Sequence, residues 1–73
     1  MLYGKGIATV GGKGLEFTTD YAGSAADVEH LVDMKVRELR ETMHSTEPAS
    51  VRYGVYDEHT FISISGLMIP GGA

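Results

Sequence analysis

The chain has no cysteine and no tryptophan, and only two prolines among its 73 residues. Without cysteine it can form neither a disulfide nor a thiolate zinc site, the two usual reinforcements of a very small domain. No apolar run approaches the ~20 residues that a membrane-spanning helix needs. Basic residues are few, six against ten acids, and the net charge of −4 disfavours binding to nucleic acid or to an anionic membrane.

The first ten residues, MLYGKGIATV, lack the basic start, the long apolar segment and the cleavage site of a secretory signal. We therefore expect a cytoplasmic protein. The length predicts a single domain over residues 1–69, followed by a disordered tail over residues 70–73. A domain of this size has a small core, so a partner that covers more of its surface would add stability.

Glycine and lysine recur in the stretch GKGIATVGGKG, residues 4–14. Glycine-rich loops that carry a lysine often bind phosphate, but the spacing of a P-loop fails here at Ile7 and at Gly14. The dinucleotide pattern G-x-G-x-x-G fails at Thr9 and at Phe17. The stretch therefore predicts no nucleotide site, and no other cofactor is predicted.

A β-hairpin accounts better for the same residues. Aromatic and β-branched residues over 2–10 predict a first strand, and alternation over 13–21 predicts a second. Gly11 and Gly12 between them suit the positive φ angles of a tight turn.

A helix is predicted from Ala25 to about Met43. Ser24 is a good N-cap, and Asp27 can complete a capping box. Asp33 and Arg37 have the spacing of an ion pair on the exposed side. Apolar residues recur with helical period and predict one buried stripe: Ala25, Val28, Val32, Val36, Leu39 and Met43.

Two more strands are predicted over residues 51–56 and 60–68, joined by Asp57, Glu58 and His59. The order ββαββ predicts an α+β fold, with one amphipathic helix packed on one face of a mostly antiparallel sheet of about four strands. One helix covers about half of the ~20 Å width of such a sheet, so nothing in the chain is left to cover the other face.

Strand alternation predicts what this other face carries, provided that Leu2, Ala8 and Val10 point at the helix. Ile62 and Ile64 then fall on the helix side, where Gly4 and Gly6 allow a close approach of the helix. The predicted residues of the other face are Tyr3, Lys5, Ile7, Arg52, Tyr56, Phe61, Ser63 and Ser65.

Two interpretations of this face stay open. It is either a solvent-exposed sheet face with scattered aromatic side chains, which is common, or a surface that binds a partner or a second copy of the chain. Aromatic residues beside an arginine are typical of interface cores, and the small size of the domain favours the interface. The candidate partner-binding residues are Tyr3, Ile7, Arg52, Tyr56 and Phe61.

The helix offers a second candidate contact on its exposed side. Met34 lies there among acids, and methionine adapts to many partners. The alternative is a single exposed methionine on a solvated helix face. The acids, which could engage a basic partner, are Asp27, Glu29, Asp33, Glu38 and Glu41.

The three histidines do not predict a site. No two of them have the i,i+4 spacing of a helical metal pair, and the acidic turn Asp57–His59 is of a type that is usually just solvated. No nucleophile motif is present, and a domain with one helix offers little room for a deep pocket. We expect no catalytic residue, no metal and no cofactor.

The order ββαββ with Gly71 and Gly72 near the end of the chain resembles the β-grasp fold of ubiquitin-like proteins and bacterial sulfur carriers. The resemblance implies a terminal glycine carboxylate that is activated as an acyl adenylate or a thiocarboxylate. Because the sequence continues to Ala73, removal of that residue would be required.

The sequence thus leads to one main hypothesis: a small, non-catalytic protein-binding module, homodimeric, of the kind found among inhibitors and accessory proteins of phages and mobile elements. Two alternatives remain: a β-grasp carrier, and an enzyme or ligand-binding dimer with its site at the subunit junction.

Overall fold

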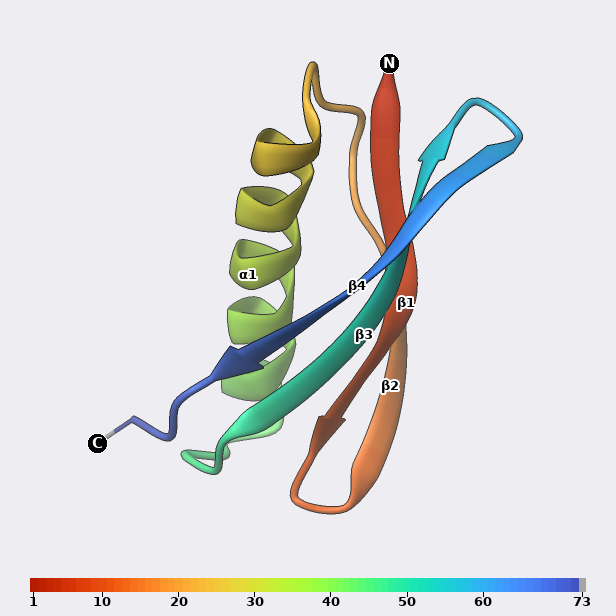
Figure 1. Cartoon of the computed structure of the whole chain (residues 1–73). Helices are drawn as coiled ribbons and strands as arrows, with labels where there is room; N and C mark the ends of the chain where they lie inside the picture. Colours follow the sequence, from red (N-terminus) through yellow and green to blue (C-terminus); the bar gives the residue numbers. More distant parts are fainter. Residues whose placement is uncertain (73) are drawn as a thin grey trace.

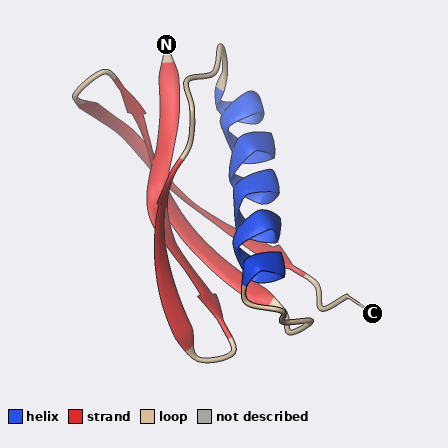
Figure 2. Ribbon diagram, turned by 180° about the vertical axis from the view of Figure 1, so that it is seen from behind, coloured by secondary structure: helices blue, strands red, loops and turns tan. Residues whose placement is uncertain are grey.

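The computed structural model describes residues 1–72, which form five elements in two layers (Figure 1). They are β1 (Leu2–Val10), β2 (Lys13–Thr18), α1 (Ala25–Thr42), β3 (Ala49–Asp57) and β4 (Thr60–Ile69). The strands form one sheet in the order β2-β1-β3-β4, with every neighbouring pair antiparallel. The helix packs on one face of this sheet (Figure 2), which confirms the predicted α+β fold.

The hairpin over the glycine-rich stretch is present. Gly11 and Gly12 form its turn with φ angles of 56° and 80°, in the region that glycine adopts without strain. β2 ends earlier than predicted, at Thr18, because Thr19 turns its hydroxyl back to accept a hydrogen bond from the Gly4 amide at 2.8 Å.

The helix begins and ends with identifiable caps. The Ser24 side chain accepts a hydrogen bond from the Asp27 amide at 3.2 Å, which confirms the predicted N-cap. At the other end His44 adopts φ 55°, and its amide donates to the Glu41 carbonyl at 2.9 Å. The Ser45 amide donates to the Arg40 carbonyl at 3.2 Å, so the helix ends in a Schellman motif. Among residues 1–72 no helix combines the length and the apolar character needed to cross a bilayer.

The core lies between α1 and the central strands. Val28, Val32 and Val36 are fully buried, and Leu39 and Met43 pack against this core while partly exposed. The sheet contributes the buried side chains of Ala8, Val10, Phe17, Ala49, Val51, Tyr53, Val55 and Ile69.

The two glycines of β1 have different roles. A Cβ on Gly4 would lie 2.9 Å from Val28 and 3.0 Å from Val32, so the helix rests on bare backbone there, as predicted. A Cβ on Gly6 would instead meet the backbone of Arg52 and Tyr53. The expectation that Gly6 admits the helix is therefore wrong: the missing side chain makes room for β3.

The register of β4 differs from the prediction. Tyr56 pairs with Phe61, but Val55 pairs with Ser63, so Ile62 is an extra residue in the ladder. From Ser63 onward, each side chain of β4 therefore lies on the face opposite to the one that a regular strand would give it. Ser63 and Ser65 therefore lie in the row that faces the helix side, and Ile64 lies in the opposite row, contrary to expectation.

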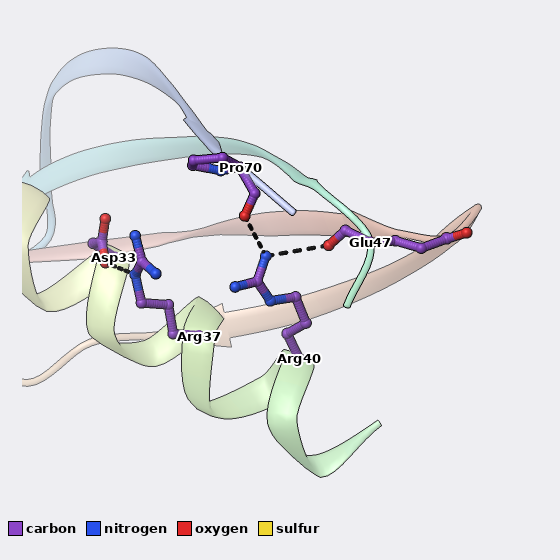
Figure 3. A network of polar contacts seen from close by, with 5 residues as sticks. All are labelled: Asp33, Arg37, Arg40, Glu47 and Pro70. Carbon is purple, nitrogen blue, oxygen red and sulfur yellow. Dashed lines mark hydrogen bonds and ion pairs between the residues drawn. The ribbon is translucent and has the colours of Figure 1, made fainter. Parts of the chain in front are cut away.

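Of the tail predicted over residues 70–73, residues 70–72 are described and lie against the end of the helix; Ala73 lies outside the described residues. An Arg40 NH₂ group donates to the carbonyls of Glu47, at 3.2 Å, and Pro70, at 2.7 Å (Figure 3). The Gly72 amide donates to the Thr46 carbonyl at 3.2 Å. The end of β4 is thereby fixed to the end of the helix.

Candidate functional site

The candidate site is the face of the sheet opposite α1, which we call the open face (Figure 2). No element of the described chain covers it, and alternation along the strands places eight large side chains there. They are Tyr3, Lys5, Ile7, Arg52, Tyr56, Phe61, Ile64 and Met68. All five partner-binding residues that the sequence predicts for this face are among them.

Aromatic rings cross the open face in one row. Tyr3 stacks on Tyr56 with ring centroids 5.4 Å apart, and Tyr21 and Phe61 continue the row edge-on at either end, each at 5.6 Å. A Cβ on Gly54 would lie 3.0 Å from the Tyr56 ring and 3.3 Å from the Phe61 ring, so these rings cover bare backbone. The two central rings of the row, Tyr3 and Tyr56, are held by the paired strands β1 and β3.

A shallow hollow of about 410 Å³ lies beside the aromatic row. Ile7 and Ile64 line it from the apolar side, and Arg52 lines it from the polar side. Gly54 contributes only backbone to this lining. The hollow is larger than any single side chain, and partner residues placed there would meet the Ile7 and Ile64 side chains and a guanidinium group.

The charge of the open face is opposite to that of the whole chain. Lys5 and Arg52 lie on it with one acid, Glu16 opposite Ile7, although the chain as a whole carries −4. The side-chain ion pairs found within residues 1–72 all lie on the helix, between Lys35 and Glu38 and between Arg37 and Asp33 (Figure 3 shows the latter). Both cations of the open face are thus available to a partner.

The remaining predicted contact residues do not join this face. Asp27, Asp33 and Met34 lie on α1, in the other layer of the molecule. Asp33 is already paired with Arg37, as the sequence predicted, and the Met34 side chain stands 54% exposed. The predicted set therefore divides into two surfaces on opposite sides of the domain.

Three residues of the open face or its border were missed by sequence reasoning. Ile64 and Met68 are 70% and 66% exposed because the extra residue in β4 moves them away from the helix side. Tyr21 follows β2 and extends the aromatic row. The uncharged sequence of β4 around Ile64 carries no signal for a bulge, whereas an aromatic residue at the end of a predicted strand is a usable signal for Tyr21.

One titratable group on the helix side of the sheet has a pKa that differs from its usual value. Burial raises the pKa of the Tyr53 hydroxyl above its usual value of 10.0, the charge of Glu29 raises it further, and a hydrogen bond with Ser65 acts in the opposite direction. Within residues 1–72 no three metal-binding side chains come together. The open face offers apolar area, aromatic rings and two cations, which is the chemistry of macromolecular binding.

Comparisons of the chain with models of protein families, with curated proteins and with solved structures find no match.

Proposed function

We propose that this chain is a small, non-catalytic module that binds another protein through the open face of its sheet and that acts as a homodimer. The observation that carries the proposal is the exposure of large apolar side chains on that face. Ile7 is 47% exposed and Phe61 55%, beside the still more exposed Ile64 and Met68. A contiguous apolar surface of this kind is typical of interaction sites.

The partner has a definable chemistry. Its contact surface is apolar at the centre, to cover Ile7 and Ile64, and it carries carboxylates that reach Lys5 and Arg52. An apolar side chain in the hollow beside Arg52 would act as the anchor of the contact. An inhibitor that covers the surface of another protein would act through the same contacts.

The acidic side of α1 supports a binding role less well. Two of its acids are paired with cations of the same helix, and a solvated acidic face is the ordinary state of an exposed helix. We therefore place the partner on the open face.

Paired aspartate substitutions test the proposal. Ile7→Asp puts a charge at the centre of the open face, and Met34→Asp puts one at a similarly exposed apolar position on the helix. Tagged wild-type and variant proteins are used for affinity capture from the native host, and a captured protein is then purified and titrated against each by calorimetry. We expect Ile7→Asp to weaken binding at least about tenfold, and Met34→Asp to bind like the wild type.

The salt dependence of binding gives an independent check. Arg52→Glu should weaken binding of an acidic partner and flatten its dependence on ionic strength, because an attractive pair becomes a repulsive one. Equal affinity of the wild type and Ile7→Asp for the purified partner would refute the proposal.

A further inference from the structure

The sheet has two edges, and they differ in how they are protected. β2 is six residues long, carries Lys13 and Glu16, and is followed by a segment that stays hydrogen-bonded to the start of β1 through Leu2 and Ala22. β4 is ten residues long and has neither a charged residue nor a proline. Natural proteins protect an edge by a short strand, by charge, by proline or by a bulge; β4 has only a bulge, at Ile62 near the hairpin end, and residues 63–69 beyond it pair regularly with β3.

The backbone groups that β4 presents can be worked out from the alternation of an antiparallel ladder. Leu2 exchanges backbone hydrogen bonds with Ala22, and the Gly4 carbonyl accepts one from the Thr19 amide. Even-numbered residues of β1 therefore point their backbone groups toward β2, and odd-numbered ones point toward β3.

The same alternation continues across the sheet. Because Lys5 of β1 is paired with Gly54, the even-numbered residues of β3 bond to β1 and the odd-numbered ones to β4. Tyr53 is paired with Ser65, so Ser65 and its odd-numbered neighbours on β4 point back toward β3. The amides and carbonyls of Ile64, Gly66 and Met68 consequently point out of the sheet, at the free edge.

We propose that a second copy of this chain pairs its β4 antiparallel with this edge, so that two sheets of four strands join into one. The inference rests on the self-association in the proposed function and names the surface through which it occurs. An antiparallel pair of identical strands has a two-fold axis, so each outward donor meets an acceptor of the partner copy and the assembly closes as a dimer.

The distribution of charge fits this arrangement. The ten uncharged residues of β4 bring no like charges together across the two-fold axis. The acids of α1 stay apart, because the helix packs mainly against β1 and least against β4. The open faces of both copies lie on the same side of the joined sheet, so they form one larger surface for the protein partner.

Gly66 allows a direct test, because it lies between Ile64 and Met68 in the outward set. A Cβ at Gly66 would meet only the Val51 carbonyl oxygen, at 3.6 Å, which is an ordinary contact. Gly66→Pro removes the outward amide and leaves the bonds to β3 in place, as proline does on edge strands. Gly66→Ala is the matched control, since it adds the Cβ and keeps the amide.

Sedimentation equilibrium of the full chain from about 10 to about 500 µM measures the result. We expect the wild type and Gly66→Ala to form dimers and nothing larger, and Gly66→Pro to raise the dissociation constant at least about tenfold. Equal dissociation constants for Gly66→Pro and Gly66→Ala, species larger than a dimer, or a monomeric wild type would each overturn the inference.

Hydrogen exchange provides a readout that needs no variant. Amide exchange at Ile64, Gly66 and Met68 should slow as the wild-type concentration rises, whereas Gly14 and Glu16 on the other edge should be unaffected. Exchange that is independent of concentration at all five amides would refute the edge contact.

Ile7→Asp separates this inference from the binding of a partner. It lies on β1, two strands away from the free edge, and should leave the dimer intact while it weakens capture of the partner. If Ile7→Asp dissociates the dimer and Gly66→Pro does not, the copies meet through their open faces; the edge inference then fails and the open face stands as a binding surface.

Discussion

Tyr56 lies opposite Phe61 across the β3–β4 hairpin, with the ring centroids 5.6 Å apart and the rings close to perpendicular. The next pair along the ladder joins Val55 to Ser63, which leaves Ile62 without a partner. This single extra residue places both Phe61 and Ile64 on the open face and turns Leu67 and Ile69 toward the core. The composition of the candidate site therefore depends on one bulge.

Deletions in β4 test the role of this bulge. Removal of Ile62 leaves Tyr56 opposite Phe61 and Val55 opposite Ser63, so the variant should fold with the same core and a stability within about 1 kcal/mol of wild type. Removal of Ser65 shifts the following residues by one position and turns Leu67 and Ile69 away from the core. The free energy of unfolding should then fall by about 1.5–3 kcal/mol for each of these two side chains. Urea unfolding measures both. Similar losses in the two variants would show that Ile62 is not the extra residue.

Val32→Asp should unfold the domain. The Val32 side chain is fully buried beneath the centre of α1, and an unpaired charge there costs several kcal/mol, about as much as the whole stability of a small domain. Circular dichroism and thermal melting measure the effect, with exposed Met34→Asp as the control on the same helix. A cooperative melt in Val32→Asp would mean that the core lies elsewhere.

His44→Gly should stabilise the domain by about 0.5–1 kcal/mol. His44 adopts φ 55° at the end of α1, where glycine has no steric penalty, and Glu58→Gly should act in the same direction at φ 57° in the β3–β4 turn. His30→Gly, within the helix, should instead lower stability by about the same amount. Urea unfolding compares the three. A loss of stability in both positive-φ variants would contradict the backbone argument.

The alkaline limit of stability should depend on Tyr53. Its pKa is raised in the folded chain, mainly by burial, so the unfolded chain loses this proton at a lower pH than the folded one. The stability associated with the neutral hydroxyl is complete below the unfolded value of about 10 and is lost as the pH rises through the folded pKa. Tyr53→Phe should show a weaker fall in the free energy of unfolding above about pH 10 than the wild type. If the free energy of unfolding depended on pH in the same way in both proteins, Tyr53 would be excluded as the cause of the fall.

Arg40→Met should release the end of β4 and leave the helix in place. The methionine keeps an apolar stem but cannot donate to the carbonyls of Glu47 and Pro70, so about 1 kcal/mol of stability is lost. Exchange of the Gly72 amide should become faster, while the amide of Val32 in the helix centre changes little. An unaltered Gly72 amide would mean that Thr46 alone holds the tail.

Much of the fold could be predicted from short-range patterns. Ser24 and the stripe of Val28, Val32 and Val36 define the helix through capping and a 3.6-residue period, and Gly11–Gly12 marks the first hairpin through its φ angles. These signals are local, so one sequence carries them.

The features that could not be predicted depend on distant neighbours. The bulge at Ile62 has no signature of composition, because its benefit appears far along the strand, where Leu67 and Ile69 reach the core. The contact of Arg40 with Pro70 joins a side chain to a backbone carbonyl 30 positions away, and any residue has such a carbonyl. For this reason Ile64 was assigned to the wrong side and Met68 was overlooked, although the face itself was identified.

The bare backbone at Gly4 has a consequence for sequence drift. Since the Val28 and Val32 side chains lie directly above it, an alanine there would place its Cβ 2.9 Å and 3.0 Å from them, and the two valines or the helix that carries them would have to shift. Related sequences should therefore keep glycine at this position, and a glycine aligned with two helical valines is a better guide to distant kin than the glycine–lysine repeat.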